Sequence, residues 1–286
     1  MANNYLSAPF PYFGSKAKVA DLVWEALGQP KHYMEPFFGS GAVLLRRPDY
    51  DYQRHLETVC DIDGFVANVW RSIQFSPDET ARWCDWPVNH ADLMARKRNL
   101  LENESRLLAN LTADPEWHDP KLAGYWIWAA SCWIGNGLLK HNAIPHLFDS
   151  GKGVHKLRHR SAVYTWFRVL SERLRYVRVV CGDWTRICGG NWQDMREGVG
   201  IFFDPPYGVK DRNTKVYRHD SPEISKEVEK WCLERGEMKT YRIVVAGYIE
   251  EYEGLKEAGW KIHRWKTHGG YGNITSRKDN QGKINR

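Results

Sequence analysis

Asp204-Pro205-Pro206-Tyr207 is the segment of this 286-residue chain whose residue types most directly suggest chemistry. It follows the apolar run 201–203, which predicts a buried strand that ends at the carboxylate. The two prolines fix the backbone and remove two N–H donors, so nearby carbonyls point outward without a partner inside the loop. A carboxylate, a free carbonyl and an aromatic ring together suit an amine on a flat base. A turn that merely closes a strand would explain the prolines but not the acid and the tyrosine.

Glu35 stands immediately before a glycine-containing turn, 36–41, between a short strand expected over 32–35 and a helix expected from about Ala42. In such a turn, glycines let a ligand approach the backbone, and the helix N-terminus offers free N–H groups. Leu44 occupies the third glycine position of the dinucleotide motif, and the Gly-Lys-Ser/Thr of phosphate loops is absent. An acid before a glycine turn suits a small cationic or zwitterionic ligand. A plain tight turn is the alternative.

Asp61 lies at the end of a second expected strand, over 57–60. An acid at this place in a doubly wound sheet commonly accepts hydrogen bonds from ribose hydroxyls. The alternative is that Asp61 caps the following helix, whose apolar positions include Val66 and Trp70. Asp63 is better placed than Asp61 for that capping role.

The elements around these acids follow the order strand, turn, helix, strand, acid and helix, which is the opening of a doubly wound parallel sheet. Further strands are expected over 177–181, 200–203, 241–246 and 260–266, and further helices over 16–27, 222–235 and 250–258. Between residues 74 and 176 the pattern predicts helices without strands, over 89–111, 121–134 and 154–176. We therefore predict an α/β fold with a doubly wound sheet. Its catalytic domain comprises 1–73 and 177–286, and a mostly helical inserted domain spans 74–176.

The composition is that of a folded protein from a reducing compartment. Hydrophobic residues make up 42% of the chain and 14 residues are tryptophan, which argues against a disordered chain. No apolar run approaches the roughly 20 residues that cross a bilayer, and the first residues lack the pattern of a secretion signal. Six cysteines occur without a Cys-x-x-Cys pair or a histidine at zinc spacing. We expect a cytoplasmic, monomeric protein that contacts no membrane and binds no metal.

Positive charge is concentrated in one part of the chain. The formal net charge is +6, whereas 137–178 alone contains nine basic residues and two acids. This is expected of a protein that binds a polyanion, although a solvated helix face is the alternative. The candidate phosphate contacts are Lys140 and four residues in or next to a glycine-containing loop, namely Lys152, Lys156, Arg158 and Arg160. Arg173 and Arg175, with Glu172 nearby, are interpreted as part of a solvated helix face.

Five short blocks occur in a specific order along the chain. They are Phe10-Pro-Tyr-Phe-Gly-Ser-Lys16, Glu35-Pro-Phe-Phe-Gly-Ser-Gly41, Asp61-Ile-Asp63, Cys181-Gly-Asp-Trp184 and Asp204-Pro-Pro-Tyr207. In this order they resemble the Dam-like (D12 class) adenine-specific DNA methyltransferases, and the matching parts cover 8–73 and 177–265. The resemblance implies a Rossmann-like, S-adenosylmethionine-dependent methyltransferase that flips an adenine out of double-stranded DNA. The inserted segment would be its target-recognition domain.

The same resemblance implies roles for individual residues. Lys16 would approach the methionine end of S-adenosylmethionine, Glu35 with the glycine turn would hold its amino acid portion, and Asp61 its ribose. The full set of implied cofactor contacts is Tyr12, Phe13, Gly14, Lys16, Glu35, Pro36, Phe37, Gly39, Gly41, Asp61, Ile62, Asp183 and Trp184, the last two for the adenine ring. The implied catalytic residues are Asp204, Pro205, Pro206 and Tyr207. The Asp204 carboxylate and the Pro205 carbonyl would hold the target amine, and Tyr207 would stack on the base. The basic residues around 140–160 would contact DNA.

Two features depart from the better known members of the family. The Trp-rich stretch within 121–134 matches them only loosely, so the recognised DNA sequence does not transfer. The chain ends at Arg286 without the closing Arg-x-Glu strand that the family leads us to expect, which suggests a truncated or divergent C-terminus.

Other functions stay open at this point. A methyltransferase could act on another planar amine, namely cytosine N4, RNA adenine or a protein glutamine. An aspartate rather than serine or asparagine at position 204 favours adenine, and the large basic insertion favours nucleic acid over protein. A DNA-binding relative without catalytic activity is the alternative from another class, and the intact set of cofactor residues speaks against it.

Overall fold

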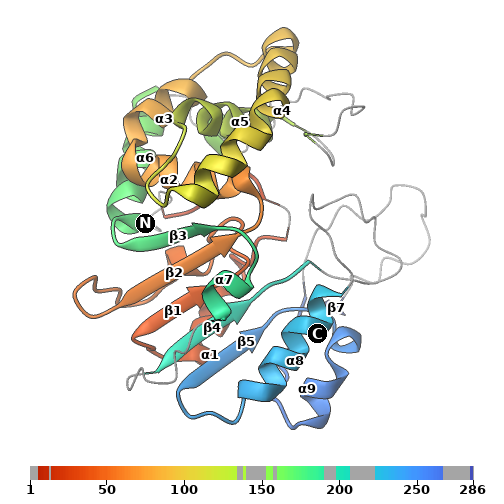
Figure 1. Cartoon of the computed structure of the whole chain (residues 1–286). Coiled ribbons are helices and arrows are strands. Elements are labelled where there is room, and N and C mark those ends of the chain that lie inside the picture. Colours follow the sequence, from red (N-terminus) through yellow and green to blue (C-terminus); the bar gives the residue numbers. More distant parts are fainter. Residues whose placement is uncertain are drawn as a thin grey trace.

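A computed structural model describes residues 6–12, 14–133, 138–139, 153–156, 160–189, 198–206, 223–266 and 284–285, the side chains of 160, 266, 284 and 285 excepted. Its centre is a five-stranded parallel sheet with the order β3-β2-β1-β4-β5 (Figure 1). The strands are β1 (His32–Glu35), β2 (Leu56–Asp61), β3 (Val177–Cys181), β4 (Val199–Phe203) and β5 (Tyr241–Val245). The chain builds outward from β1 to β3 and then restarts with β4 on the other side of β1. Ligands of open α/β sheets bind at the carboxyl ends of the strands where the order reverses, which here is between β1 and β4.

Side chains of the strands alternate between two faces, and each face packs against its own helices. One hydrophobic core joins Tyr33 and Val59 of the sheet to α1 (Ala20–Leu27) and α2 (Gly64–Phe75). The second core joins Met34, Cys60 and Phe203 of the opposite face to α7 (Thr185–Cys188), α8 (Ile224–Arg235) and α9 (Glu253–Glu257). Figure 1 shows α8 and α9 beside the β5 edge of the sheet. Helices therefore cover both faces, as expected for a doubly wound sheet.

The described part of 74–176 is helical and shares the first core. Its elements are α3 (Pro77–Cys84), α4 (His90–Ala113), α5 (Pro120–Cys132), a 3-10 turn, η2 (Gly153–Lys156), and α6 (Arg160–Leu174). They gather with α2 beyond the β3 edge of the sheet (Figure 1). Leu107, Ile127 and Phe167 lie in the same buried cluster as the side chains of α2. The expected boundary at residue 74 falls inside α2, and a separate target-recognition domain stays a prediction.

Sequence patterns placed most of the elements correctly, but they predicted two elements that do not form and did not predict the helices α3 and α7. The expected helix from about Ala42 is wrong, because the chain there forms only a 3-10 turn, η1 (Leu44–Arg46). Pro48 forces the preceding Arg47 into an extended conformation, with ψ 121°, and so prevents the helix from continuing. The expected strand over 260–266 is also wrong. Only β6 (Trp265–Lys266) forms, antiparallel to β7 (Ile284–Asn285) in a separate sheet, because side chains at 261, 262 and 264 are exposed and give a strand no face to bury.

Arg173 of α6 is not on a solvated face, contrary to the sequence interpretation. Its guanidinium lies 2.7 Å from the Glu57 carboxylate of β2 and donates to the Leu44 carbonyl at 2.8 Å. Arg47 contacts the same carboxylate at 3.2 Å, and the side chains of Glu57 and Arg47 are fully buried. Sequence inspection paired Arg173 with the adjacent Glu172, whereas its partner is 116 positions away. Arg175 is exposed, as interpreted.

The Glu57 carboxylate separates two buried guanidinium groups, so its removal leaves both without their shared counterion. We expect Glu57→Gln to lower the free energy of unfolding by about 3–5 kcal/mol, as for other broken buried ion pairs. Denaturant titration measures this. Asp78→Asn is the matched control, because Asp78 pairs with Arg168 at 2.7 Å while both side chains are more than half exposed. That control should cost less than about 1 kcal/mol. Equal losses in the two variants would contradict the structural role of Glu57.

Candidate active site

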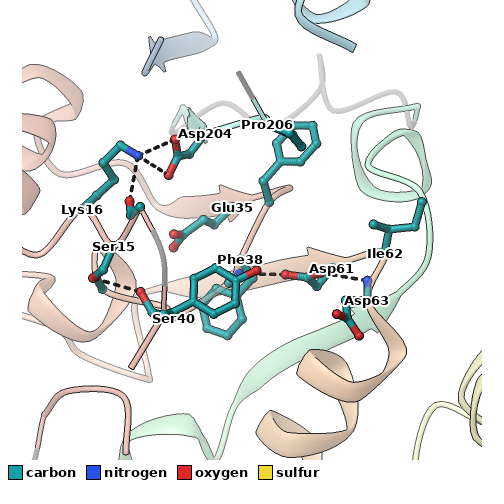
Figure 2. Close-up of a pocket in the computed structure, with 15 residues that line it drawn as sticks. Ser15, Lys16, Glu35, Phe38, Ser40, Asp61, Ile62, Asp63, Asp204 and Pro206 are labelled. Atoms are coloured by element: carbon teal, nitrogen blue, oxygen red, sulfur yellow. Dashed lines mark hydrogen bonds and ion pairs between the residues drawn. The ribbon is translucent and has the colours of Figure 1, made fainter. Parts of the chain in front are cut away.

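A cleft lies at the carboxyl ends of β1, β2 and β4, where the strand order reverses (Figure 2). Glu35 is the last residue of β1, Asp61 the last of β2, and Asp204 directly follows β4. The residues that line the cleft are Tyr12, Gly14, Ser15, Lys16, Glu35, Phe37, Phe38, Gly39, Ser40, Ala42, Asp61, Ile62, Asp63, Asp204 and Pro206. Three motif acids that are far apart in the sequence thus share one cleft, because parallel strands end at the same edge.

The turn after β1 requires its glycines. Gly39 and Gly41 have φ angles of 47° and 58°, in the left-handed region that side chains disfavour. A Cβ on Gly39 would lie 2.5 Å from the Tyr12 ring, and one on Gly41 would lie 2.7 Å from the Phe38 ring. The Gly39 carbonyl also accepts a hydrogen bond from the Trp70 indole at 2.8 Å. This turn therefore brings bare backbone and two aromatic rings against the cleft in a fixed arrangement.

Asp61 fastens the end of β2 to this turn. One carboxylate oxygen accepts the Gly39 N–H at 2.8 Å, and the other accepts the Asp63 N–H at 2.9 Å. The helix-capping alternative for Asp61 is wrong, because the α2 cap is Asp63, whose side chain accepts from the Phe65 N–H. Burial raises the pKa of Asp61 to about 7, with a further contribution from the Asp63 charge, and the two backbone hydrogen bonds oppose the rise. Each carboxylate oxygen keeps a second lone pair that can accept from a ligand hydroxyl.

Glu35 is a buried acid in the floor of the cleft. It is 3% exposed, and the Tyr33 hydroxyl donates to its carboxylate at 2.9 Å. Burial raises the pKa of Glu35 well above its ordinary value, the Tyr33 hydrogen bond opposes this, and the charge of Asp204 adds to it. A cationic group next to Glu35 would favour the ionised carboxylate. Glu35 therefore suits a positively charged ligand group.

Asp204 forms an ion pair with Lys16 at the rim of β4 (Figure 2). The Lys16 ammonium lies 2.7 Å from each Asp204 carboxylate oxygen and donates to the Gly14 carbonyl at 2.9 Å. The side chains of Lys16 and Asp204 are 8% and 20% exposed. Pro206 lines the cleft beside them, so the start of the predicted catalytic motif faces the same space as the motifs predicted to bind the cofactor.

Asp183 and Trp184 lie next to this cleft rather than in its lining. The Asp183 carboxylate accepts the Thr185 N–H at 2.9 Å and stabilises the start of α7. Trp184 is 5% exposed in the second core and stacks behind Phe37, with ring centroids 6.4 Å apart. Pro36 and Gly41 also stay out of the lining.

Sequence reasoning missed five lining residues, namely Ser15, Phe38, Ser40, Ala42 and Asp63. Four of them belong to the motif blocks, and the fifth, Ala42, directly follows one. Membership of a block could therefore have identified these residues as part of the site. Ser40 donates to Ser15 at 3.2 Å and links the first two blocks across the cleft.

Several predicted site residues lie outside the described part of the chain. They are Phe13, Tyr207, Lys140, Lys152 and Arg158, together with the side chain of Arg160. Lys156 is described and is exposed at the end of η2. Within the described ranges, no group of three or more His, Cys, Asp or Glu side chains is arranged to hold a metal ion. Over the same ranges, no helix combines the length and apolar character needed to span a membrane.

The family model for D12 class N6 adenine-specific DNA methyltransferases matches residues 12–106. This stretch contains the first motif block from Tyr12 onward and the whole of the second and third, and it confirms the resemblance drawn from them. A search of curated proteins gave no match. The match supports an enzymatic activity, the methylation of adenine N6 in DNA. The family implies S-adenosylmethionine as the methyl donor.

The chemistry of the cleft fits this methyl donor. The lining includes four acids, Glu35, Asp61, Asp63 and Asp204, against one base, Lys16. S-adenosylmethionine carries positive charge on its sulfonium and α-amino groups, and it also has ribose hydroxyls that can donate hydrogen bonds. Because burial already raises the pKa of Glu35 and of Asp61, an arriving cation has a larger effect on their ionisation here than in bulk water.

The raised pKa of Asp61 has a consequence for stability. Between about pH 4, where the unfolded chain loses this proton, and about pH 7, the folded protein binds more protons at Asp61 than the unfolded chain does. The resulting stabilisation is present at low pH and is lost as pH rises through about 7. We expect the unfolding free energy of the wild type to fall more between about pH 5 and about pH 8 than that of Asp61→Asn. Glu257→Gln, an exposed position on α9, controls for the loss of one carboxylate. Parallel pH curves for wild type and Asp61→Asn would contradict the shift.

Proposed function

We propose that this protein is a site-specific DNA methyltransferase that transfers a methyl group to N6 of an adenine flipped out of double-stranded DNA. The observation that carries the proposal is the position of Asp204, which shares one cleft with Glu35 and Asp61 at the reversal of strand order. An acceptor for the target amine and acids suited to a cationic methyl donor therefore lie side by side. When bound there, S-adenosylmethionine supplies a methyl group that its sulfonium already activates.

The chain's own residues have to position the amine and accommodate charge. Adenine's amine is a weak nucleophile because its lone pair is delocalised into the ring. Hydrogen bonds from the amine to the Asp204 carboxylate and the Pro205 carbonyl would favour the pyramidal amine. The same acceptors would stabilise the positive charge that develops on nitrogen. Asp204 need not remove a proton first, since the proton can leave after transfer.

Reaching the amine requires that the base leave the duplex, which costs a few kcal/mol. Tyr207, which lies outside the described residues, is proposed to recover part of this cost by stacking on the base. For the cofactor, Glu35 and the Gly39–Gly41 turn would bind the amino acid portion, and Asp61 the ribose. Trp184 and Asp183 would act at the adenine end, where Trp184 supports the cleft residue Phe37. The helical segment 74–176 would recognise the DNA sequence.

Sequencing that detects modified bases, run on DNA from cells that express the protein, tests the reaction and reveals the methylated site. N6-methyladenine in a fixed sequence context is expected. N4-methylcytosine, or no modified base in DNA, would overturn the proposal.

Asp204→Ala should reduce methyl transfer to below about a tenth of wild type, because the amine loses its charged acceptor. Affinity for S-adenosylmethionine should stay within about threefold, since Asp204 meets the amine and not the donor. Radiolabelled methyl transfer and calorimetry measure the two quantities, and Glu257→Ala, at an exposed position on α9, is the control. Substantial turnover in Asp204→Ala would refute the catalytic assignment.

The loop charges Lys152, Lys156, Arg158 and Arg160 are proposed to contact DNA phosphates together with Lys140. Each alanine substitution among the four should lower the magnitude of the slope of log affinity against log salt by about 0.9, for all DNA sequences alike. Lys226→Ala with Lys230→Ala, at exposed positions on α8, is the control pair. An unchanged slope in the fourfold variant would show that the loop does not follow the DNA backbone. A loss of affinity confined to one DNA sequence would instead show that these residues contact the bases.

A further inference from the structure

Lys16 is a buried cation that contacts Asp204, the proposed acceptor of the target amine, and the Gly14 carbonyl. It is 7% exposed, and its ammonium lies 2.7 Å from both oxygens of the Asp204 carboxylate. The Gly14 carbonyl, 2.9 Å away, fixes the ammonium from the other side. The two partners are 188 positions apart in the sequence, so the contact ties the N-terminal block to the end of β4. Figure 2 shows the Lys16 side chain pointing at Asp204.

The surroundings of Asp204 explain why it needs a cation. The Glu35 carboxylate faces it from β1, and its pKa is raised by burial and further by the charge of Asp204. Asp204 also contributes to the raised pKa of the buried Tyr252 hydroxyl, beyond β5, for which burial is the main cause. Asp61 and Asp63 line the same cleft from the β2 side. When several carboxyl groups share a site, their mutual repulsion raises the pKa of at least one of them. Lys16 is the basic side chain of the described lining, and its positive charge opposes that rise.

We propose that Lys16 is a positioning residue for the reaction, which holds Asp204 ionised and oriented toward the target amine instead of serving as a contact for the methyl donor. The inference rests on the proposed function of Asp204. Each Asp204 oxygen has a second lone pair, so the amine can bind while Lys16 stays in place.

The charge state of Asp204 matters because of hydrogen-bond polarity. An ionised carboxylate offers only acceptors to the two N–H bonds of the amine. A protonated Asp204 would present an O–H donor to an amine that has donors of its own, and its remaining acceptor is weaker. Turnover should therefore fall on the acid side as Asp204 takes up a proton. Removal of Lys16 should move that fall to higher pH.

The test compares wild type with Lys16→Met, which removes the charge, and Lys16→Arg, which keeps it. In Lys16→Met the acid limb of kcat should move upward by about 1–3 pH units, the usual effect of an adjacent opposite charge on a carboxyl group. The loss of turnover should be largest on the acid side and should recover as pH rises above the shifted limb, whereas Lys16→Arg should keep most of the wild-type profile. Affinity for S-adenosylmethionine, measured by calorimetry, should change less than about threefold.

A second measurement does not depend on turnover. Carboxyl carbon NMR of the protein without cofactor follows the titration of Asp204, with the signal assigned by its loss in Asp204→Asn. The Asp204 midpoint should lie higher in Lys16→Met than in wild type. Should Lys16→Met fail to fold, Lys16→Gln also removes the charge and can still donate to the Gly14 carbonyl.

Three results would overturn the inference. They are equal Asp204 midpoints with and without the Lys16 charge, a loss of cofactor affinity with an unmoved pH profile, and a rise of kcat in Lys16→Met. The second result would make Lys16 a cofactor contact, and the third would make it a competitor of the amine. If wild type transfers no methyl group to DNA, the proposed function fails, while the NMR titration still decides whether Lys16 holds Asp204 ionised.

Discussion

The reversal of strand order between β1 and β4 is the constraint on which the site depends. Because all five strands of this sheet are parallel, their carboxyl ends share one edge, and a reversal of strand order leaves a crevice at that edge. Glu35 ends β1, Asp204 follows β4, and Asp61 ends the neighbouring β2. The fold thus concentrates carboxylates in a partly buried space, which is unfavourable in an empty cleft and favourable for a cationic ligand.

Each of these acids is accommodated differently, and the differences match different tasks. Asp61 accepts two backbone N–H groups and holds the glycine turn in place. Glu35 accepts hydrogen bonds from the Tyr33 hydroxyl and from the Leu44 backbone, so both of these donors are neutral. Asp204 has the Lys16 ammonium against both oxygens. In the proposed reaction, a cationic group of the methyl donor would bind near Glu35, and the Lys16 ion pair would keep Asp204 an anion for the uncharged amine.

The helices of 74–176 are continuous with the catalytic half. They share a hydrophobic core with α2, and Arg173 of α6 bridges to Glu57 of β2 and to the Leu44 carbonyl, just beyond the glycine turn. A buried ion triad of this kind contributes little net stability compared with apolar packing, but breaking it is costly. These contacts fix the position of α6, in the segment proposed to recognise DNA, relative to the turn that borders the cleft.

The sequence by itself predicted the five strands of the parallel sheet, the acids at their ends and the family resemblance, because these depend on local pattern and on short motifs with fixed residue types. It also identified Asp63 as the cap of α2, since capping joins residues two apart. Only the tertiary structure decided which charges meet. Lys16 reaches Asp204 across 188 positions and Arg173 reaches Glu57 across 116, so neither pair leaves a periodic signal in the sequence. The 3-10 turn at Leu44–Arg46 and the loss of the strand over 260–266 were likewise decided by backbone restriction and burial rather than by apolar pattern.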